Sequence, residues 1–456
     1  MPYQLLSFKH FYKVYLVLFF WFISLGTFDS SFAQDSSNEM VDLNKLYLSA
    51  INSHYDDIEK LYSARSMPNP VRDIHNQINA MPGSKLLFYS FQNDELYIWL
   101  ADANGPITYS KISITAEQLD LQIESFRRYF QRNTGVRSAE NLRNITVNEA
   151  YVSPTSDAEF NNIHEEISRT LLPEEILTAV EANDFLIIIP SRSIGSVPFY
   201  SLQHLDPDSR IIDHHTILLA PHLFIVQPDL RIGERFIIVG NPEYPANEDY
   251  LFTDLPGAEM EAELIASKFD RPILMRGASA TKSNLVALMD NAQFIHLATH
   301  GIANHESPLD NSFLIFAEDT NSPGGMLTAR EIQNSKIPAI LVVLSACQTG
   351  LGMSLDGGLI GLARAFLKAG TRNVVMSLWD VDDTVTSTLM DQFYTNLSVN
   401  GQKYLLNSDS RSRLDLMYWQ AVAGALRDAK LTVRENNPEA FYWASFAVFS
   451  TPFSAQ

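Results

Sequence analysis

The sequence predicts an α/β fold: a mainly parallel sheet flanked by helices on both faces, preceded by a small subregion that contains a β-hairpin. Three observations support this prediction. From Arg235 onwards, short apolar runs alternate with amphipathic stretches, which is typical of strands and helices that take turns along the chain. The runs are mainly apolar, as in strands buried on both faces. Upstream, two apolar runs flank Asn93-Asp94, which indicates a hairpin.

The part before Arg235 is expected to mix helices and strands. Apolar residues from Leu43 to Leu61 recur mostly every three or four positions, which predicts an amphipathic helix. A second helical stretch follows before Met81. The remaining predicted elements are the hairpin strands Leu86–Phe91 and Leu96–Leu100, a strand at Ile107–Ile114, a helix at Thr115–Arg132, a strand at Phe185–Pro190 and a turn at Ile194–Phe199.

In the part after Arg235, strands and helices are expected to alternate. Predicted strands are Phe236–Gly240, Ile273–Met275, the run Phe294–Ala298, Phe313–Phe316, Ile340–Ser345 and Asn373–Leu378. Predicted helices are Gly257–Lys268, Thr281–Met289 with Thr281 as N-cap, Leu327–Gln333, Gly357–Ala369 and Thr384–Leu397. The polar stretch Asn400–Ser412 is predicted to be a surface loop. Ligands of such sheets bind at the carboxyl ends of the strands.

The chain is acidic, with 53 Asp and Glu against 33 Lys and Arg and a formal net charge of -20. This charge argues against nucleic acid as the main partner, because phosphates require clustered cations. It also argues against an anionic membrane surface. A neutral or basic protein or peptide partner remains compatible.

The first residues are typical of a secretory signal. Lys9 and Lys13 precede the apolar run Val14–Ile23, and Ser31–Ala33 forms a small-x-small cleavage site. The run is shorter than the roughly 20 residues of a spanning helix, so a cleaved signal is favoured over a retained anchor. The mature chain is then expected to begin at Gln34 and to be exported to the periplasm or beyond, without stable membrane insertion.

Two motifs carry residues that are suited to nucleophilic catalysis. Cys347, the one cysteine of the chain, lies in Leu344–Gly350 (LSACQTG), directly after an apolar run. His300 lies in His296–Gly301 (HLATHG), after another such run. A thiol and an imidazole at the ends of two strands is the arrangement that a cysteine nucleophile needs. On these residues alone, a structural cysteine and a structural histidine remain the alternatives.

Other kinds of site find little support. His296, His300 and His305 suggest a metal site, but Leu297 stands where a zinc-helix signature has its glutamate, and the segment is predicted to be a strand. No Gly-x-Ser-x-Gly elbow and no phosphate-binding glycine loop is present. We therefore expect neither a metal nor another cofactor.

The motifs together resemble the CHAT-domain family, a group of caspase-like cysteine peptidases of clan CD related to separases and caspases. The resemblance covers roughly residues 80–456 and rests on many ordered motifs. These are Val197–Phe199 with Leu202, Val239–Pro242, Leu255–Glu261, His296–Gly301, Leu344–Gly350, Gly361–Phe366, Ser377–Asp383 and Phe441–Phe446.

This resemblance implies a cysteine endopeptidase with a caspase-like sheet. It implies that Cys347 is the nucleophile, that His300 is the catalytic histidine, and that the backbone N–H groups of Gly301 and Cys347 form the oxyanion hole. The resemblance further places Ser345, Trp379 and Asp380 at the substrate pocket. Asp356 lies nearby in the motif order, and an acidic pocket would select Arg or Lys at P1.

The alternative for the aspartates is helix capping, as for Asp383 before Thr384. The expected organisation is a signal peptide at 1–33, a short helical segment at 34–80, and a CHAT domain at 81–456, divided at about residue 230. Many family members carry long tetratricopeptide arrays, and here only about one helical hairpin fits before the first β-hairpin. The 34–80 segment is a candidate inhibitory pro-segment. A rival to the enzyme is a non-enzymatic scaffold that binds protein partners through the same cleft.

Overall fold

The structure is a computed structural model of the chain. It describes residues 43–52, 70–79, 81, 83–132, 157–221, 233–246, 250, 252–304, 307–345, 353–355, 358–379, 383–405 and 411–451. The chain forms two compact units, Met1–Tyr47 and Leu48–Gln456. Of the first unit, residues 43–47 are described, and they are helical. All elements named below belong to the second unit.

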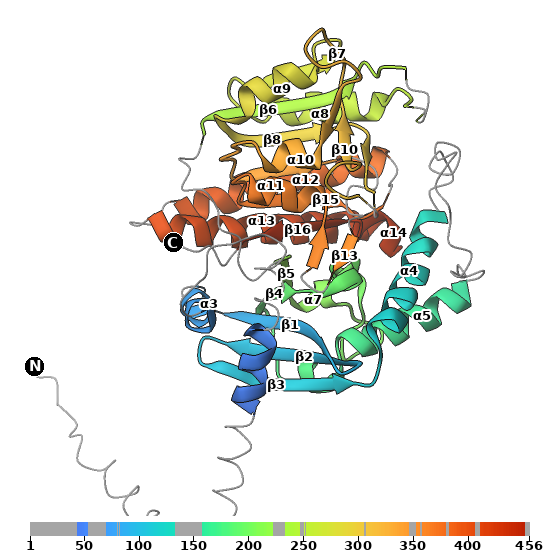
Figure 1. Cartoon of the computed structure of the whole chain (residues 1–456), viewed down its shortest axis with the longest axis vertical. Helices are drawn as coiled ribbons and strands as arrows, with labels where there is room; N and C mark the ends of the chain where they lie inside the picture. Colours follow the sequence, from blue (N-terminus) through green and yellow to red (C-terminus); the bar gives the residue numbers. More distant parts are fainter. Residues whose placement is uncertain are drawn as a thin grey trace, which may run out of the picture. The chain divides into compact units, whose positions relative to one another are not determined.

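An 11-stranded sheet runs through the described part of the second unit, in the order β3-β2-β1-β4-β5-β16-β15-β12-β8-β6-β7 (Figure 1). Its strands are β1 Ser84–Gln92, β2 Glu95–Asp102, β3 Gly105–Ile112, β4 Phe185–Ile189, β5 Thr216–Leu219, β6 Arg235–Pro242, β7 Ile273–Gly277, β8 Ala292–Ala298, β12 Leu341–Leu344, β15 Asn373–Ser377 and β16 Phe446–Ser450. Smaller sheets contain β9 Gly301–Ile302, β10 Phe313–Ile315 and β11 Met326–Thr328, and the hairpin of β13 Met353–Leu355 with β14 Gly358–Ile360.

The large sheet is mostly parallel, which confirms the predicted fold class. Strands β15, β12, β8, β6 and β7 pair in parallel, and so do β1, β4, β5 and β16. The direction reverses between β15 and β16, which pair antiparallel. The predicted hairpin belongs to this same sheet, because β1 also pairs in parallel with β4.

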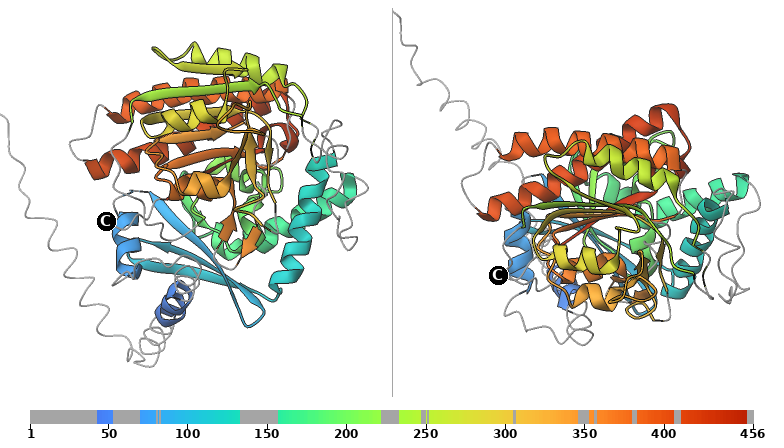
Figure 2. Two further views of the ribbon diagram at one scale, coloured as in Figure 1. Left: turned by 45° about the horizontal axis from the view of Figure 1, so that its top comes forward. Right: turned by 90° about the horizontal axis from the view of Figure 1, so that it is seen from above.

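Helices cover both faces of the sheet (Figure 2). On one face α8 contacts β6, β7 and β8, and α13 contacts β5 and β16. On the other face α9 contacts β8 and α11 contacts β15. The helices are α3 Pro70–Asn79, α4 Ala116–Arg132, α5 Asp157–Leu171, α6 Glu174–Leu177, α7 Ile211–His214, α8 Pro256–Ala266, α9 Lys282–Met289, α10 Ala329–Gln333, α11 Leu362–Lys368, α12 Asp383–Leu405, α13 Arg411–Asn436 and α14 Ala440–Trp443, with the 3-10 turns η1 Arg192–Ser196 and η2 Phe199–Ser201.

Local chemistry explains why two of the predicted elements form where they do. Asn93 and Asp94 have φ angles of 50° and 61°, the left-handed conformation that a two-residue hairpin turn requires and that Asn and Asp tolerate. Helix α9 begins at Lys282 because Thr281 caps it, its hydroxyl accepting the N–H of Asn284 at 3.1 Å. Both features confirm the sequence-based predictions.

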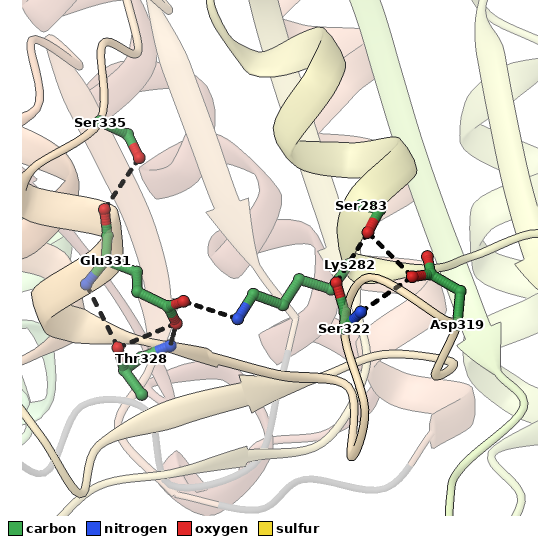
Figure 3. A network of polar contacts seen from close by, with 7 residues as sticks. All are labelled: Lys282, Ser283, Asp319, Ser322, Thr328, Glu331 and Ser335. Atoms are coloured by element: carbon green, nitrogen blue, oxygen red, sulfur yellow. Dashed lines mark hydrogen bonds and ion pairs between the residues drawn. The ribbon is translucent and has the colours of Figure 1, made fainter.

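A polar network joins α9 to α10 (Figure 3). Glu331 accepts the N–H of Thr328 at 2.9 Å, while the Thr328 hydroxyl accepts the N–H of Glu331 at 3.2 Å. This capping box fixes the start of α10 at Ala329. Glu331 also pairs with Lys282 at 2.6 Å. The predicted helix Leu327–Gln333 was therefore wrong at its start, because Met326–Thr328 pairs with β10 as a strand.

Two further predictions were wrong. The helix predicted at Gly357–Ala369 begins later in the structure, at Leu362 of α11. Residues Gly358–Ile360 instead pair with β13 as a strand. The loop predicted at Asn400–Ser412 is largely helical, since α12 continues to Leu405 and α13 starts at Arg411. Helices α12 and α13 pack along each other, and this contact stabilises a polar segment that has no strong helical pattern of its own.

The N-terminal segment 1–33, with its predicted signal sequence, lies outside the described residues. No helix in the described ranges combines the length and the apolar character that a membrane crossing requires. Helix α3, within the predicted 34–80 segment, contacts β1 and β2.

Candidate active site

Three neighbouring parallel strands end at one edge of the sheet, shortly before the predicted site residues in the sequence. Leu344 of β12 is paired with Leu297 of β8 on one side and with Met376 of β15 on the other. The chain then continues for three residues from each of these positions, to Cys347, His300 and Trp379 respectively. Cys347 itself lies outside the described residues.

The pairing extends one residue beyond the end of β12. The N–H of Ser345 donates to the carbonyl oxygen of Leu297 at 3.0 Å. Ser345 is half-buried. The two segments that lead to the thiol and to the imidazole are thus hydrogen-bonded to each other up to three residues before His300.

The ring of His300 is held by a backbone carbonyl. Its Nε2 donates to the carbonyl oxygen of Thr253 at 2.8 Å, in the segment before α8. Because a carbonyl oxygen only accepts, Nε2 carries the proton, and the neutral ring has its lone pair on Nδ1.

Aromatic rings and a threonine fix the surroundings of His300, which is half-buried. The ring centroids of Tyr244 and Phe252 lie 4.8 Å and 5.5 Å from that of His300. The hydroxyl of Thr299 donates to the carbonyl oxygen of Ile315 at 2.6 Å. These contacts restrict the rotamers of the imidazole and the path of the turn that carries it.

Gly301 follows His300 as the first residue of β9, where it is paired with Leu314 of β10. The N–H of Ile315 donates to the carbonyl oxygen of His300 at 3.1 Å. A bond at this position makes the Gly301–Leu314 pair a non-hydrogen-bonded one, so the N–H of Gly301 points away from β10. Since β9 is an edge strand of its small sheet, this N–H is directed outwards.

His296 takes part in a separate, buried polar cluster. Its side chain is 1% exposed, with Nδ1 3.2 Å from the hydroxyl of Tyr394 and Nε2 3.0 Å from Oε1 of Glu261. Burial, and then the charge of Glu261, raise the pKa of Tyr394 well above its usual value. The cluster joins α8, β8 and α12 beneath the edge that carries His300. Among the residues that the structure describes, no group of three or more His, Cys, Asp or Glu is placed to hold a metal ion. His305 lies outside those residues.

Of the four predicted pocket residues, Ser345 and Trp379 are described. Trp379 is 2% exposed, its Nε1 donates to the carbonyl oxygen of Phe441 at 3.0 Å, and its ring stacks on Phe130 at 4.3 Å between centroids. Asp356 and Asp380 lie outside the described residues.

Asp383, the alternative capping residue, is the first residue of α12. Its carboxylate lies close to Gly257 in the first turn of α8, where a Cβ on Gly257 would come within 2.5 Å of Asp383. A carboxylate at the start of two helices is favoured by their dipoles.

The sequence did not indicate Thr253, Tyr244 or Phe252 as partners of His300. Thr253 acts through its backbone carbonyl, which leaves no residue-type signal. The two aromatic residues lie in a segment without clear periodicity, so their approach to His300 depends on the tertiary fold.

Comparison with protein families matches residues 161–451 to the CHAT domain. Tetratricopeptide repeat protein 28 of Homo sapiens is 25% identical over 270 residues, which cover 51% of this chain and 10% of that protein. The Mus musculus protein of the same name is 24% identical over 263 residues, or 48% and 11%. The chain thus spans about a tenth of the length of these relatives.

Solved structures show weaker likeness. The separase–securin complex of Saccharomyces cerevisiae matches at 10% identity with a TM-score of 0.45, covering 83% of this chain and 30% of that one. The Arg-specific cysteine proteinase gingipain R matches at 12% identity with a TM-score of 0.36, covering 72% and 73%.

Proposed function

The chain belongs to the CHAT domain family, and on this premise we propose that it is a cysteine endopeptidase with Cys347 as nucleophile and His300 as its acid–base partner. The observation that carries the proposal is the pairing of Leu297 with Leu344. His300 follows Leu297 by three residues, and Cys347 follows Leu344 by three residues. The pairing therefore aligns the two strands that lead to them.

The local geometry supports a role for His300 in proton transfer. Neighbouring strands lie about 4.8 Å apart, so the segments leading to the two residues start side by side. The hydrogen bond from His300 to the Thr253 carbonyl orients the ring and supports Nδ1 as the nitrogen that faces the thiol. A third group that orients the base is a regular part of such sites.

The proposed reaction has two steps. The thiol of Cys347 first gives its proton to His300, and the resulting thiolate attacks the scissile carbonyl carbon. The N–H groups of Gly301 and Cys347 stabilise the oxyanion. The C–N bond then breaks, and His300 protonates the leaving amine. Water attacks the resulting thioester, which releases the new carboxyl terminus and restores the thiol.

The substrate is a protein or peptide in extended conformation, which adds as a strand at the site edge. We assign the pocket to Ser345, Asp356, Trp379 and Asp380. Its acidic residues and the net charge of -20 favour Arg or Lys at P1. If the aspartates instead only stabilise the starts of helices, where Asp383 lies in α12, no basic preference will appear.

The setting is proposed from the N-terminal sequence. A signal peptide at 1–33 would export the mature chain from Gln34 to the periplasm or beyond. The candidate pro-segment, residues 34–80, would then precede the peptidase in the exported chain. Its removal should raise the rate of cleavage if it is inhibitory.

The test compares the chain from Gln34 with its Cys347→Ala and His300→Ala variants on casein and on a peptide library, with new termini read by mass spectrometry. We expect cleavage after Arg or Lys, lowered at least about 100-fold in both variants. His204→Ala, which removes a half-buried histidine from another part of the chain, is the control and should keep full activity.

Each other outcome has a defined meaning. Equal activity of the wild type and Cys347→Ala would reject the peptidase assignment. A folded wild type that cleaves nothing would favour the non-enzymatic scaffold. Loss of activity with a chelator, combined with resistance to iodoacetamide, would indicate a metallohydrolase.

A further inference from the structure

Helix α4 (Figure 1) lies outside the region 161–451 that matches the family, yet it contacts both η1 and Trp379. Its apolar side is buried, with exposures of 0–1%. The buried residues of that side are Leu119, Ile123, Phe126 and Phe130. The helix is therefore a firmly packed part of the second unit.

The first contact joins the start of α4 to η1. Oδ2 of Asp120 accepts Nε of Arg192 at 2.8 Å, and Oδ1 accepts both the N–H of Ser193 at 3.3 Å and its hydroxyl. Arg192 has a φ angle of 50°, which costs a non-glycine residue about 1 kcal/mol or more. The carboxylate of Asp120 binds the side chain of this strained residue and the residue that follows it, and so stabilises η1.

The 3-10 turn η1 also contacts both strands of the β13–β14 hairpin. The chain enters this hairpin at Met353, six residues after Cys347. Asp120 thus supports, through η1, the hairpin that directly follows the nucleophile motif.

The second contact joins the end of α4 to Trp379. The rings of Phe130 and Trp379 stack with an interplanar angle of 14°. On its other side Trp379 is held by the bond to the Phe441 carbonyl. Because Trp379 is the second residue after β15, its ring is fixed near the end of a strand adjacent to β12.

The two contacts lie along one helix. Asp120 and Phe130 are ten residues apart, or about 15 Å along a helix. Helix α4 therefore holds both η1, which packs on the hairpin after Cys347, and the ring of Trp379.

We propose that α4 is a positioning element for this site, with Asp120 setting the hairpin after Cys347 and Phe130 setting the pocket wall at Trp379. This inference rests on the proposed function for its meaning. Its test does not require turnover, because the chain holds a single cysteine and the alkylation of Cys347 by iodoacetamide can be followed by intact mass.

The variants are Asp120→Ala, Asp120→Asn, Phe130→Leu and Phe130→Tyr in the chain from Gln34. Ile74→Ala is the control, since it removes buried bulk from α3, which packs on β1 and β2. Alkylation rates are measured from pH 5.5 to 9 at temperatures where every variant is folded. Peptide cleavage gives KM and kcat separately.

We expect Asp120→Ala and Phe130→Leu each to change the alkylation rate constant at least threefold, with Phe130→Leu raising KM at least fivefold at a similar kcat. Asp120→Asn should have a smaller effect. Phe130→Tyr, which keeps the ring, should have an alkylation rate constant and a KM close to those of the wild type. The proposal is overturned if Asp120→Ala and Phe130→Leu alkylate like Ile74→Ala. If the wild type cleaves nothing, the proposed function fails while the alkylation result still decides the role of α4.

Discussion

Lys430 provides a quantitative test of the packing at the edge that carries the site. It lies in α13 with its side chain fully buried, and its Nζ donates to the carbonyl oxygens of Phe446 at 2.5 Å and Ala444 at 3.5 Å. The Nζ also lies 4.7 Å from the ring centroid of Tyr200. Burial lowers the pKa of Lys430 from 10.5 to about 7.

This pKa shift makes the stability of the protein depend on pH. Below pH 7 the amine is charged in both the folded and the unfolded state, and the full cost of burying the charge is present. Between pH 7 and 10.5 the unfolded chain retains a proton that the folded chain has lost, so the free energy of unfolding rises with pH. At about 1.4 kcal/mol per pH unit at most, the gain from pH 7 to 9 is about 2 kcal/mol.

Lys430→Met removes this dependence. We would measure urea unfolding of the wild type and the variant at pH 7, 8 and 9, with Lys336→Met, at an exposed lysine, as control. The free energy of unfolding of the wild type minus that of Lys430→Met should rise by about 2 kcal/mol over this range. The free energy of unfolding of the wild type minus that of Lys336→Met should stay constant. Titration of other groups cancels in these differences.

A constant difference between the wild type and Lys430→Met would refute the reasoning. It would mean that the amine is not held in a dry environment at Phe446. Next to Phe446, the carbonyl oxygen of Ser445 accepts the N–H of Leu378 at 2.6 Å. Packing at the end of β15, next to Trp379, would then have to be reconsidered as well.

Further predictions concern local geometry and catalysis. Gly325→Ala should cost about 2–4 kcal/mol of unfolding free energy in denaturant titrations, because φ is 62° and a Cβ would lie 1.9 Å from the oxygen of Phe316. Gly324→Ala, with φ of 75° but no atom within 4 Å, should cost only about 1 kcal/mol, and equal losses would contradict this explanation. Thr281→Ala should lower stability by about 1 kcal/mol through the lost cap of α9, and an unchanged melting curve would argue against that cap. His300→Gln should lower kcat about 100-fold or more with a small change in KM, whereas a pure KM effect would assign His300 to binding.

The sequence predicted those elements whose cause is local. The hairpin at Asn93-Asp94 and the cap at Thr281 depend on residues within a few positions of each other. The strands before His300 and Cys347 were evident because mainly apolar runs are typical of strands buried on both faces. The ends of these runs also predicted the edge of the sheet after which His300 and Cys347 follow in the sequence.

The sequence could not predict elements that depend on distant pairing. Residues Gly358–Ile360 form a strand only because β13 lies beside them, and the last turns of α12 are helical because α13 packs along them. The partners of His296, namely Glu261 and Tyr394, come from two other helices. The partner of His300 is a backbone atom of Thr253, which no residue pattern specifies.

The joint action of Cys347 and His300 is tested most directly by a mechanism-based label. A peptidyl acyloxymethyl ketone with Arg at P1 would be reacted with the wild type and with His300→Ala, and the Cys347 adduct followed by intact mass. Iodoacetamide, which needs no histidine, reports the reactivity of the thiol itself. We expect the ketone to label the wild type at least about 100-fold faster than His300→Ala, with iodoacetamide rates within about tenfold. Equal labelling of both proteins by the ketone would contradict a shared site.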